Sequence, residues 1–145
     1  MKITKSDWII LILRKSPLDR IHIMKALFLI WHRSRRKMQD YYYFEPYLYG
    51  PYSLEVYSDL RNFLGQGLVV QPPHSVQQWA NYYLTVQGHK KAEEIVAKID
   101  RTDIALIENI VEEVSHLDFI ELLRKVYREA PDFAVSSVLK EVIKP

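Results

Sequence analysis

The chain has 145 residues, 48% hydrophobic and 26% charged, which is typical of a globular protein with a buried core. It contains no cysteine, which excludes disulfides, thiol catalysis and cysteine-bound zinc. Its net charge of +2 is uneven: residues 1–40 carry ten Lys or Arg against three Asp or Glu, and the remainder ten against fifteen. This asymmetry favours an anionic partner for one face and a different role for another.

The first two expected helices lie in the basic part. Residues 8–13 are apolar nearly all round, which predicts a deeply buried helix with Ser6 as its N-cap. This run is too short for a signal peptide or a membrane span, so we expect a cytoplasmic protein that does not enter a membrane. Ser16 and Pro17 end the helix, and a second helix is expected from Asp19 to about Lys37.

A third helix is expected after Pro51, with Ser53 as its N-cap and a buried stripe at Val56, Leu60, Phe63 and Leu64. Gly67 is placed to take the left-handed conformation that ends it. Residues 68–71 and 79–84 then read as two strands of a hairpin. A helix, a glycine stop and two short strands follow one another in this order in a winged helix.

Four further helices are expected. The first covers residues 86–99 with Thr85 as its cap, and the others lie near 103–115, 119–129 and 137–143. The apolar stripes of 103–115 and 119–129 suit either a homodimer interface or the chain's own core. The expected fold is mainly α (α+β): a winged helix-turn-helix domain with a two-stranded wing over 1–100 and a helical C-terminal extension over 101–145.

Two resemblances support this interpretation. The pattern Leu60-x-x-Phe63-Leu64-x-x-Gly67-Leu68-Val69, followed by Tyr83-Leu84-Thr85-x-x-Gly88, resembles the core of winged-helix regulators of the MarR and PadR kinds. Residues 25–29, followed by Phe44-x-Pro46-Tyr47-x-Tyr49-Gly50-Pro51-Tyr52-Ser53, are similar to the Panacea family, which is associated with antitoxins. The first resemblance implies a transcription regulator, and the second implies a toxin or another protein as partner.

The candidate duplex DNA contacts fall into two groups. A basic cluster ends the second helix and could contact phosphates, although cations also collect at helix C-termini because the helix dipole favours them there. Its members are Arg33, Arg35, Arg36 and Lys37. On the third helix the residues expected nearest base edges are Ser53, Tyr57, Arg61 and Asn62. Glu55 and Asp59 on the same helix would repel phosphate, which counts against ordinary sequence-specific binding.

The alternative function is a protein-interaction module without direct DNA binding. Tyrosine is favoured as an interface anchor, and Tyr42, Tyr47 and Tyr52 are the candidate partner-binding residues of the aromatic turn. No catalytic motif, metal-ligand spacing or cofactor motif is visible. Lys25 is the one unusual ionisable residue, because it lies within an apolar helix; we expect it to extend to solvent or to pair with a carboxylate.

Overall fold

The computed structural model describes residues 3–139, and this part of the chain is mainly helical, as expected. It contains six α-helices and two antiparallel sheets of two strands each. The helices are α1 (Asp7–Lys15), α2 (Arg20–Arg33), α3 (Leu54–Gly65), α4 (Val86–Val96), α5 (Arg101–Ser115) and α6 (Phe119–Glu129). The strands are β1 (Glu45–Tyr47), β2 (Gly50–Tyr52), β3 (Val69–Val70) and β4 (Tyr83–Leu84). None of the helices described has the length and apolar character needed to cross a membrane.

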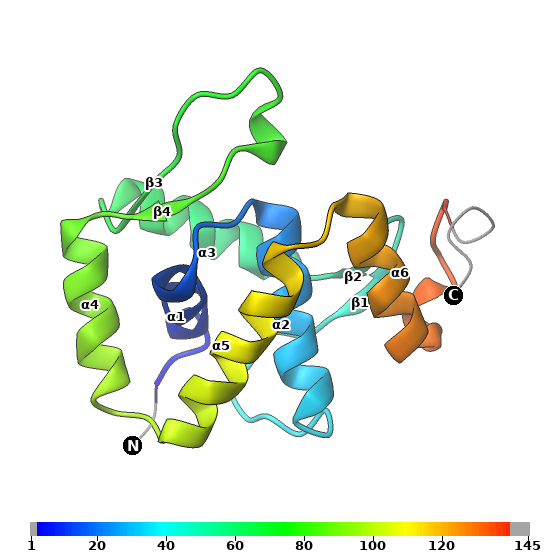
Figure 1. The fold of residues 1–145 in the computed structure, drawn as a ribbon, viewed down its shortest axis with the longest axis horizontal. Coiled ribbons are helices and arrows are strands. Elements are labelled where there is room, and N and C mark those ends of the chain that lie inside the picture. Colours follow the sequence, from blue (N-terminus) through cyan, green and yellow to red (C-terminus); the bar gives the residue numbers. More distant parts are fainter. Residues whose placement is uncertain (1–2, 140–145) are drawn as a thin grey trace.

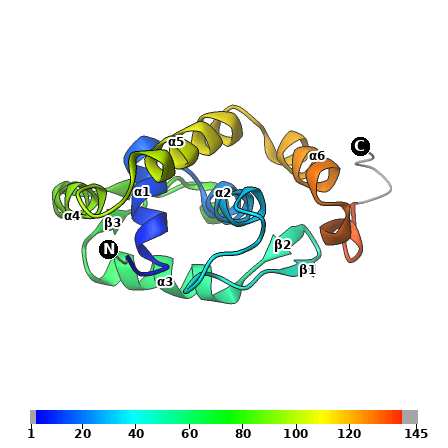
Figure 2. The same cartoon turned by 90° about the horizontal axis from the view of Figure 1, so that it is seen from below.

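The core is built around α1 and α2. All six residues from Trp8 to Leu13 are buried, as are the eight from Ile23 to Ile30. Seen from below, the two helices lie between α5 on one side and α3 on the other, with α4 at one end (Figure 2). This placement explains why both are apolar on nearly every face: neighbouring helices cover each of those faces.

The corner between α1 and α2 joins the β3–β4 region. Leu18 forms an isolated antiparallel bridge with Tyr82, and the amide of Tyr82 donates to the carbonyl of Leu18 at 2.9 Å. Asp19 caps α2 by accepting from the amide of His22 at 2.8 Å. The start of α2 is therefore fixed against the segment that leads into β4.

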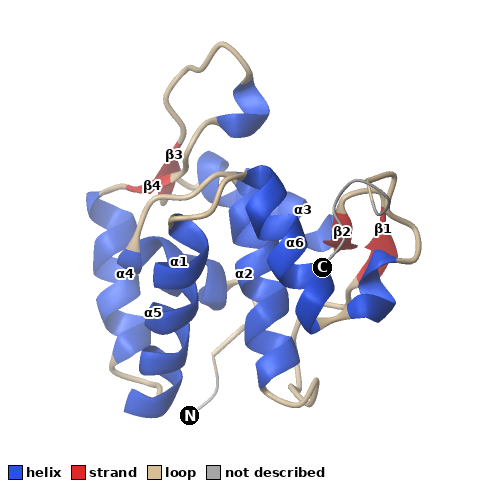
Figure 3. Cartoon of the chain, turned by 45° about the vertical axis from the view of Figure 1, so that its right-hand side comes forward, coloured by secondary structure: helices blue, strands red, loops and turns tan. Residues whose placement is uncertain are grey.

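A hairpin of β1 and β2, which the sequence analysis did not predict, follows α2 and precedes α3 in the sequence, and it lies at one edge of the molecule beside α6 (Figure 3). Pro46 pairs with Pro51 and Tyr47 with Gly50, so only Leu48 and Tyr49 form the turn. Gly50 has φ +90, and a Cβ there would lie 3.3 Å from Cε1 of Tyr127. Glycine thus supplies both the left-handed backbone and the close approach of the hairpin to α6.

The β3–β4 sheet is shorter than predicted. Gly67 has φ +73 and follows the end of α3, as expected, but each strand has only two residues. The connection between them projects from the body and contains the short 3₁₀ helix η1 (Gln77–Trp79) (Figure 1). The side-chain amide of Gln71 donates to the carbonyl of Ala80 at 3.1 Å and ties the two arms of this connection together.

The C-terminal helices pack onto the rest of the chain. Ile107, Ile110 and Val114 of α5 and Leu122 and Leu123 of α6 are buried in the same core as α1 and α2. Of the two roles left open for these stripes, the chain's own core is the one seen.

Some helix limits differ from the prediction, and α4 ends at Val96 rather than at residue 99. The second helix ends at Arg33 rather than near Lys37, because Arg35 and Arg36 have left-handed φ values of 62 and 56. A 3₁₀ helix, η2 (Pro131–Ala134), follows α6. Of the helix predicted at 137–143, residues 137–139 are not helical, and the rest lies outside the described residues.

Candidate functional site

The basic cluster is held largely by ion pairs within the chain. The Arg33 guanidinium pairs with Glu129 at 3.0 Å and also with Glu113. Arg36 pairs with Asp132 at 2.8 Å and lies over the ring of Trp31, 5.2 Å from its centroid. These carboxylates come from α5, α6 and η2, so two of the four cations fasten the C-terminal elements to the end of α2. Arg35 and Lys37 are exposed.

The structure does not bring this cluster together with the predicted base-contacting residues of α3. Arg20, at the first residue of α2, lines a hollow with Tyr57 and Arg61, whereas Arg33 is the last residue of that helix. A helix rises about 1.5 Å per residue, so the two groups lie at ends of α2 roughly 20 Å apart. In Figure 1 the loop that follows α2 lies at the opposite side of the molecule from the β3–β4 connection.

The residues predicted on α3 differ in accessibility. Arg61 and Asn62 are exposed, and Tyr57 is half-buried beside the Arg20 guanidinium. Ser53, however, is 6% exposed, so it cannot reach a base edge without rearrangement. It is buried because the chain turns inward there, from β2 into α3.

The two acidic residues of α3 have partners. Glu55 forms an ion pair with Lys5, and Asp59 accepts a hydrogen bond of 2.6 Å from the Tyr42 hydroxyl. The ammonium of Lys5 offsets the negative charge of Glu55 and so reduces the repulsion that the sequence predicted on this helix, whereas the neutral hydroxyl of Tyr42 leaves the charge of Asp59 in place.

Of the three predicted partner-binding tyrosines, the structure brings two together. The rings of Tyr47 and Tyr52 lie 4.9 Å apart across the hairpin. Tyr42 is only 2% exposed, so the prediction that it is available to a partner is wrong. Its ring is part of the core, and its hydroxyl donates a hydrogen bond to the carboxylate of Asp59.

Tyr47 and Tyr52 border a cleft of about 280 Å³, which we call the aromatic cleft. Two runs of rings line it: Tyr47, Tyr52 and Tyr57 lie in successive contact, and so do Tyr49, Phe119 and Trp79. The centroids of neighbouring rings are 4.9–5.6 Å apart. These rings come from the hairpin, α3, η1 and the first residue of α6, and together form an apolar wall with aromatic faces.

Lys25 lies in the lining of this cleft and is 3% exposed. Its ammonium donates to the carbonyl of Pro51 at 3.3 Å, and no carboxylate among residues 3–139 lies within ion-pair distance of it. The expectation that it extends to solvent or pairs with a carboxylate is therefore wrong. Burial lowers the pKa of Lys25 to about 7, although the negative charge of Asp19 offsets part of this effect.

Arg20 is the second cation of the aromatic cleft. Its Nη2 donates to the side-chain oxygen of Gln78 at 3.3 Å, and its guanidinium lies 5.1 Å from the ring centroid of Tyr57. Its Nε is buried and has no hydrogen-bond partner among the described residues. A buried donor without an acceptor is costly, so this atom points to a missing partner.

No family model matches this chain, and none of the curated proteins matches it either.

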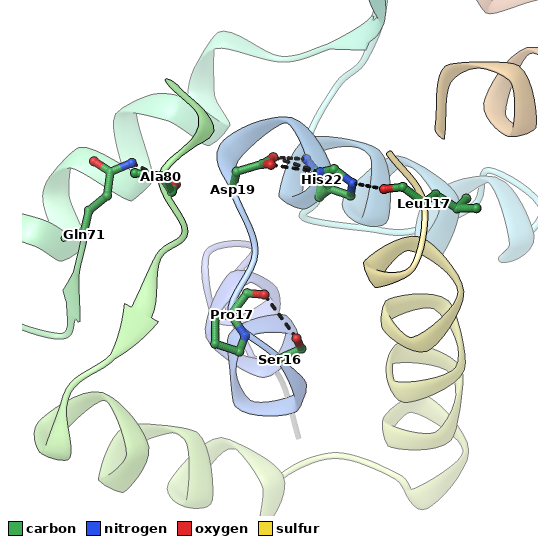
Figure 4. Close-up of polar contacts among 7 residues, drawn as sticks. All are labelled: Ser16, Pro17, Asp19, His22, Gln71, Ala80 and Leu117. Carbon is green, nitrogen blue, oxygen red and sulfur yellow. Dashed lines mark hydrogen bonds and ion pairs between the residues drawn. The ribbon is translucent and has the colours of Figure 1, made fainter. Parts of the chain in front are cut away.

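The start of α2 is braced by His22, one helical turn from Lys25. Its Nδ1 lies 2.9 Å from a carboxylate oxygen of Asp19, and its Nε2 lies 2.7 Å from the carbonyl of Leu117 (Figure 4). Burial alone would lower the pKa of His22, but its bonds to Asp19 and Leu117 outweigh burial and raise it. This contact holds the loop between α5 and α6, and hence Phe119, next to α2.

Sequence reasoning missed most of the aromatic cleft. Lys25 was singled out because an ionisable residue inside an apolar helix is unusual. Tyr47, Tyr52 and Tyr57, which also line the cleft, were named as contact residues for a partner or for DNA, but nothing in the sequence joined them to Lys25 in one site. No local sequence pattern links the other lining residues, Gln78, Trp79 and Phe119, to Lys25. They approach α2 only through the β3–β4 connection and the turn before α6.

Proposed function

We propose that this chain is a protein-interaction module that binds its partner through the tip of the β1–β2 hairpin. The observation that carries the proposal is the exposure of three successive large side chains at the hairpin tip: Tyr47, the last residue of β1, is 50% exposed, and Leu48 and Tyr49 of the turn are 41% and 46% exposed. Adjacent exposed apolar side chains mark interaction surfaces, and tyrosine is favoured among interface anchors.

The hairpin is held in place, which favours binding. The carbonyl of Leu48 accepts from the amide of Val138 at 3.1 Å, and Tyr49 packs edge-on against Phe119. A surface already fixed before binding loses little conformational entropy in the complex. This hairpin would therefore present its side chains as a preformed patch.

The order of the helices and of the β3–β4 sheet supports a winged-helix interpretation of the fold. Helices α1, α2 and α3 precede the β3–β4 sheet, and the Leu18–Tyr82 bridge adds one strand residue between α1 and α2. In this interpretation the β3–β4 connection is the wing, and the hairpin is an insertion between α2 and α3. The interaction surface would then be an addition to a winged-helix core.

The proposal is tested by affinity capture from the natural host with wild-type bait and with a Tyr47→Ser/Tyr49→Ser double variant. A control bait, Val70→Ser/Tyr83→Ser, removes two side chains that are also exposed, but on the β3–β4 sheet. We expect a stoichiometric partner on the wild-type and control baits and at least about tenfold less on the hairpin variant. Equal recovery on all three baits would refute the proposal.

Duplex DNA is a second candidate partner, favoured by the ion pair of Glu55 with Lys5, which offsets one of the two negative charges on α3; Asp59 is turned to the Tyr42 hydroxyl. With these acids engaged, Arg61 and Asn62 remain exposed on α3, and Arg20 lies near Arg61. This surface would make the protein a DNA-associated regulator that contacts the duplex through α3 rather than through the end of α2.

The DNA candidate predicts a specific salt dependence. In fluorescence anisotropy with a labelled duplex, Arg61→Glu should reduce affinity and lower the slope of log K against log salt by about 1. Arg35→Glu/Lys37→Glu is the matched control, because both residues are exposed at the far end of α2. Arg33 and Arg36 are unsuitable, since their replacement breaks ion pairs within the chain. A larger loss in the control would instead assign DNA contacts to the basic cluster.

A further inference from the structure

The aromatic cleft combines three features that occur together in ligand sites. It is concave, its walls are aromatic, and two cationic side chains, Lys25 and Arg20, line it. A volume of about 280 Å³ suits a ligand with one or two fused rings rather than a single ion or a water molecule.

Both cations have donor capacity that the described residues do not use. An ammonium has three N–H groups, and the hydrogen bond described for Lys25 is a single one, to the carbonyl of Pro51. The buried Nε of Arg20 has no partner among residues 3–139. A buried cation that forms no ion pair is unfavourable, so an acceptor that carries negative charge would stabilise the cationic lining of the cleft.

Asp19 does not already serve as this acceptor. Its carboxylate forms an ion pair with His22, and neither Lys25 nor Arg20 lies within ion-pair distance of it. The negative charge that the cleft lacks must therefore come from outside the described residues. A planar ring beside that charge would meet the faces and edges of Tyr52, Tyr57 and Trp79.

We propose that the aromatic cleft binds an aromatic carboxylate, with the carboxylate held by Lys25 and Arg20 and the ring held by the surrounding aromatic side chains. The same chemistry occurs in a free small molecule and in a polypeptide that ends in an aromatic residue. The proposal does not depend on the hairpin tip being a partner-binding surface, because the charged part of the site lies on α2.

Calorimetric titration of the full chain with matched acid and amide probes tests the proposal. The small-molecule pair is 2-naphthoate and 2-naphthamide, and the peptide pair is Gly-Gly-Phe with a free or an amidated C-terminus. We expect an acid to bind at least about tenfold more tightly than its amide, because a hydrogen bond to a charged acceptor is stronger than one to a neutral acceptor. Binding of naphthoate alone indicates a free ligand, whereas binding of the peptide acid alone indicates a chain terminus.

Variants show whether the charge of the cleft is responsible. Lys25→Met keeps the length of the side chain and removes its charge, and it should weaken binding of the acid about tenfold to a hundredfold. Arg20→Gln should also weaken it, while Arg35→Gln, which removes an exposed cation elsewhere, should leave it unchanged. Circular dichroism confirms that each variant is folded. The proposal is overturned if neither acid binds, if amides bind equally well, or if folded Lys25→Met binds the acid as tightly as the wild type.

Discussion

Replacing Gly88 with alanine is expected to lower the free energy of unfolding by about 3 kcal/mol or more. Gly88 lies in the first turn of α4, where a Cβ would stand 2.1 Å from the carbonyl oxygen of Leu68. That oxygen also accepts the amide of Thr85 at 3.0 Å, so relief would require movement of the β3–β4 backbone. Urea denaturation followed by circular dichroism measures the change.

Gly65→Ala is the matched control for this substitution. Gly65 ends α3, and a Cβ at that position would meet nothing within 4 Å. Alanine has a higher helix propensity and a less flexible unfolded chain, so this variant should be as stable as the wild type or more stable by up to about 1 kcal/mol. Similar losses of stability in both variants would show that close packing at Gly88 is not the cause.

The second large effect concerns Lys25. Lys25→Met is expected to raise the free energy of unfolding at pH 7 by about 2 kcal/mol, because it replaces a buried ammonium lacking a nearby carboxylate with an apolar side chain of similar length. A higher free energy of unfolding in this variant would show that Lys25 destabilises the wild-type fold. Stability would then have been given up for the charge that lines the aromatic cleft.

Lys25 also predicts how stability depends on pH. The unfolded lysine keeps its proton up to its ordinary pKa of 10.5, whereas the folded one releases it near pH 7. Between these values the unfolded state binds more protons, so stability rises with pH, by at most about 1.4 kcal/mol per pH unit. Urea denaturation from pH 7.5 to 9 should show this rise in the wild type and little of it in Lys25→Met.

Two other groups, His22 and Tyr57, also contribute to the dependence of stability on pH. The raised pKa of His22 adds stability at low pH that is lost as pH rises through its folded value, so its effect has the opposite sign to that of Lys25 and is retained in Lys25→Met. Burial also raises the pKa of Tyr57 to about 12, which costs stability once unfolded tyrosine ionises near pH 10. Parallel pH profiles for wild type and Lys25→Met would contradict the assignment to Lys25.

The sequence predicted most helices because local signals were sufficient for them. The stripe of Val56, Leu60 and Phe63 has helical spacing, and Asp118 and Glu121, three residues apart, form a capping box at the start of α6. The hairpin was missed because Pro46 and Pro51 oppose a strand assignment, yet in a two-stranded hairpin each strand has a free edge where proline is tolerated. The left-handed residues that end α2 are arginines, which carry no turn signal.

The candidate sites were less predictable because their properties depend on contacts distant in sequence. Arg33 appeared as a free cation, but Glu113 and Glu129, 80 and 96 residues away, pair with it. Tyr42 appeared exposed, but Asp59 and the core enclose it. The spacing of residues along the chain does not reveal such pairings. Charge and aromatic content therefore predicted that the protein binds a partner, but not which residues form the binding site.

The composition of the aromatic cleft has a consequence for folding. Its lining comes from positions near 20, 50, 79 and 119, so the cleft exists only after segments about a hundred residues apart have come together. An occupant therefore binds the native chain and not the unfolded one, and at a hundred times its dissociation constant it adds about 2.7 kcal/mol to the free energy of unfolding. Resistance of the chain to proteolysis would then increase with the concentration of the ligand, so the ligand would control the abundance of this protein.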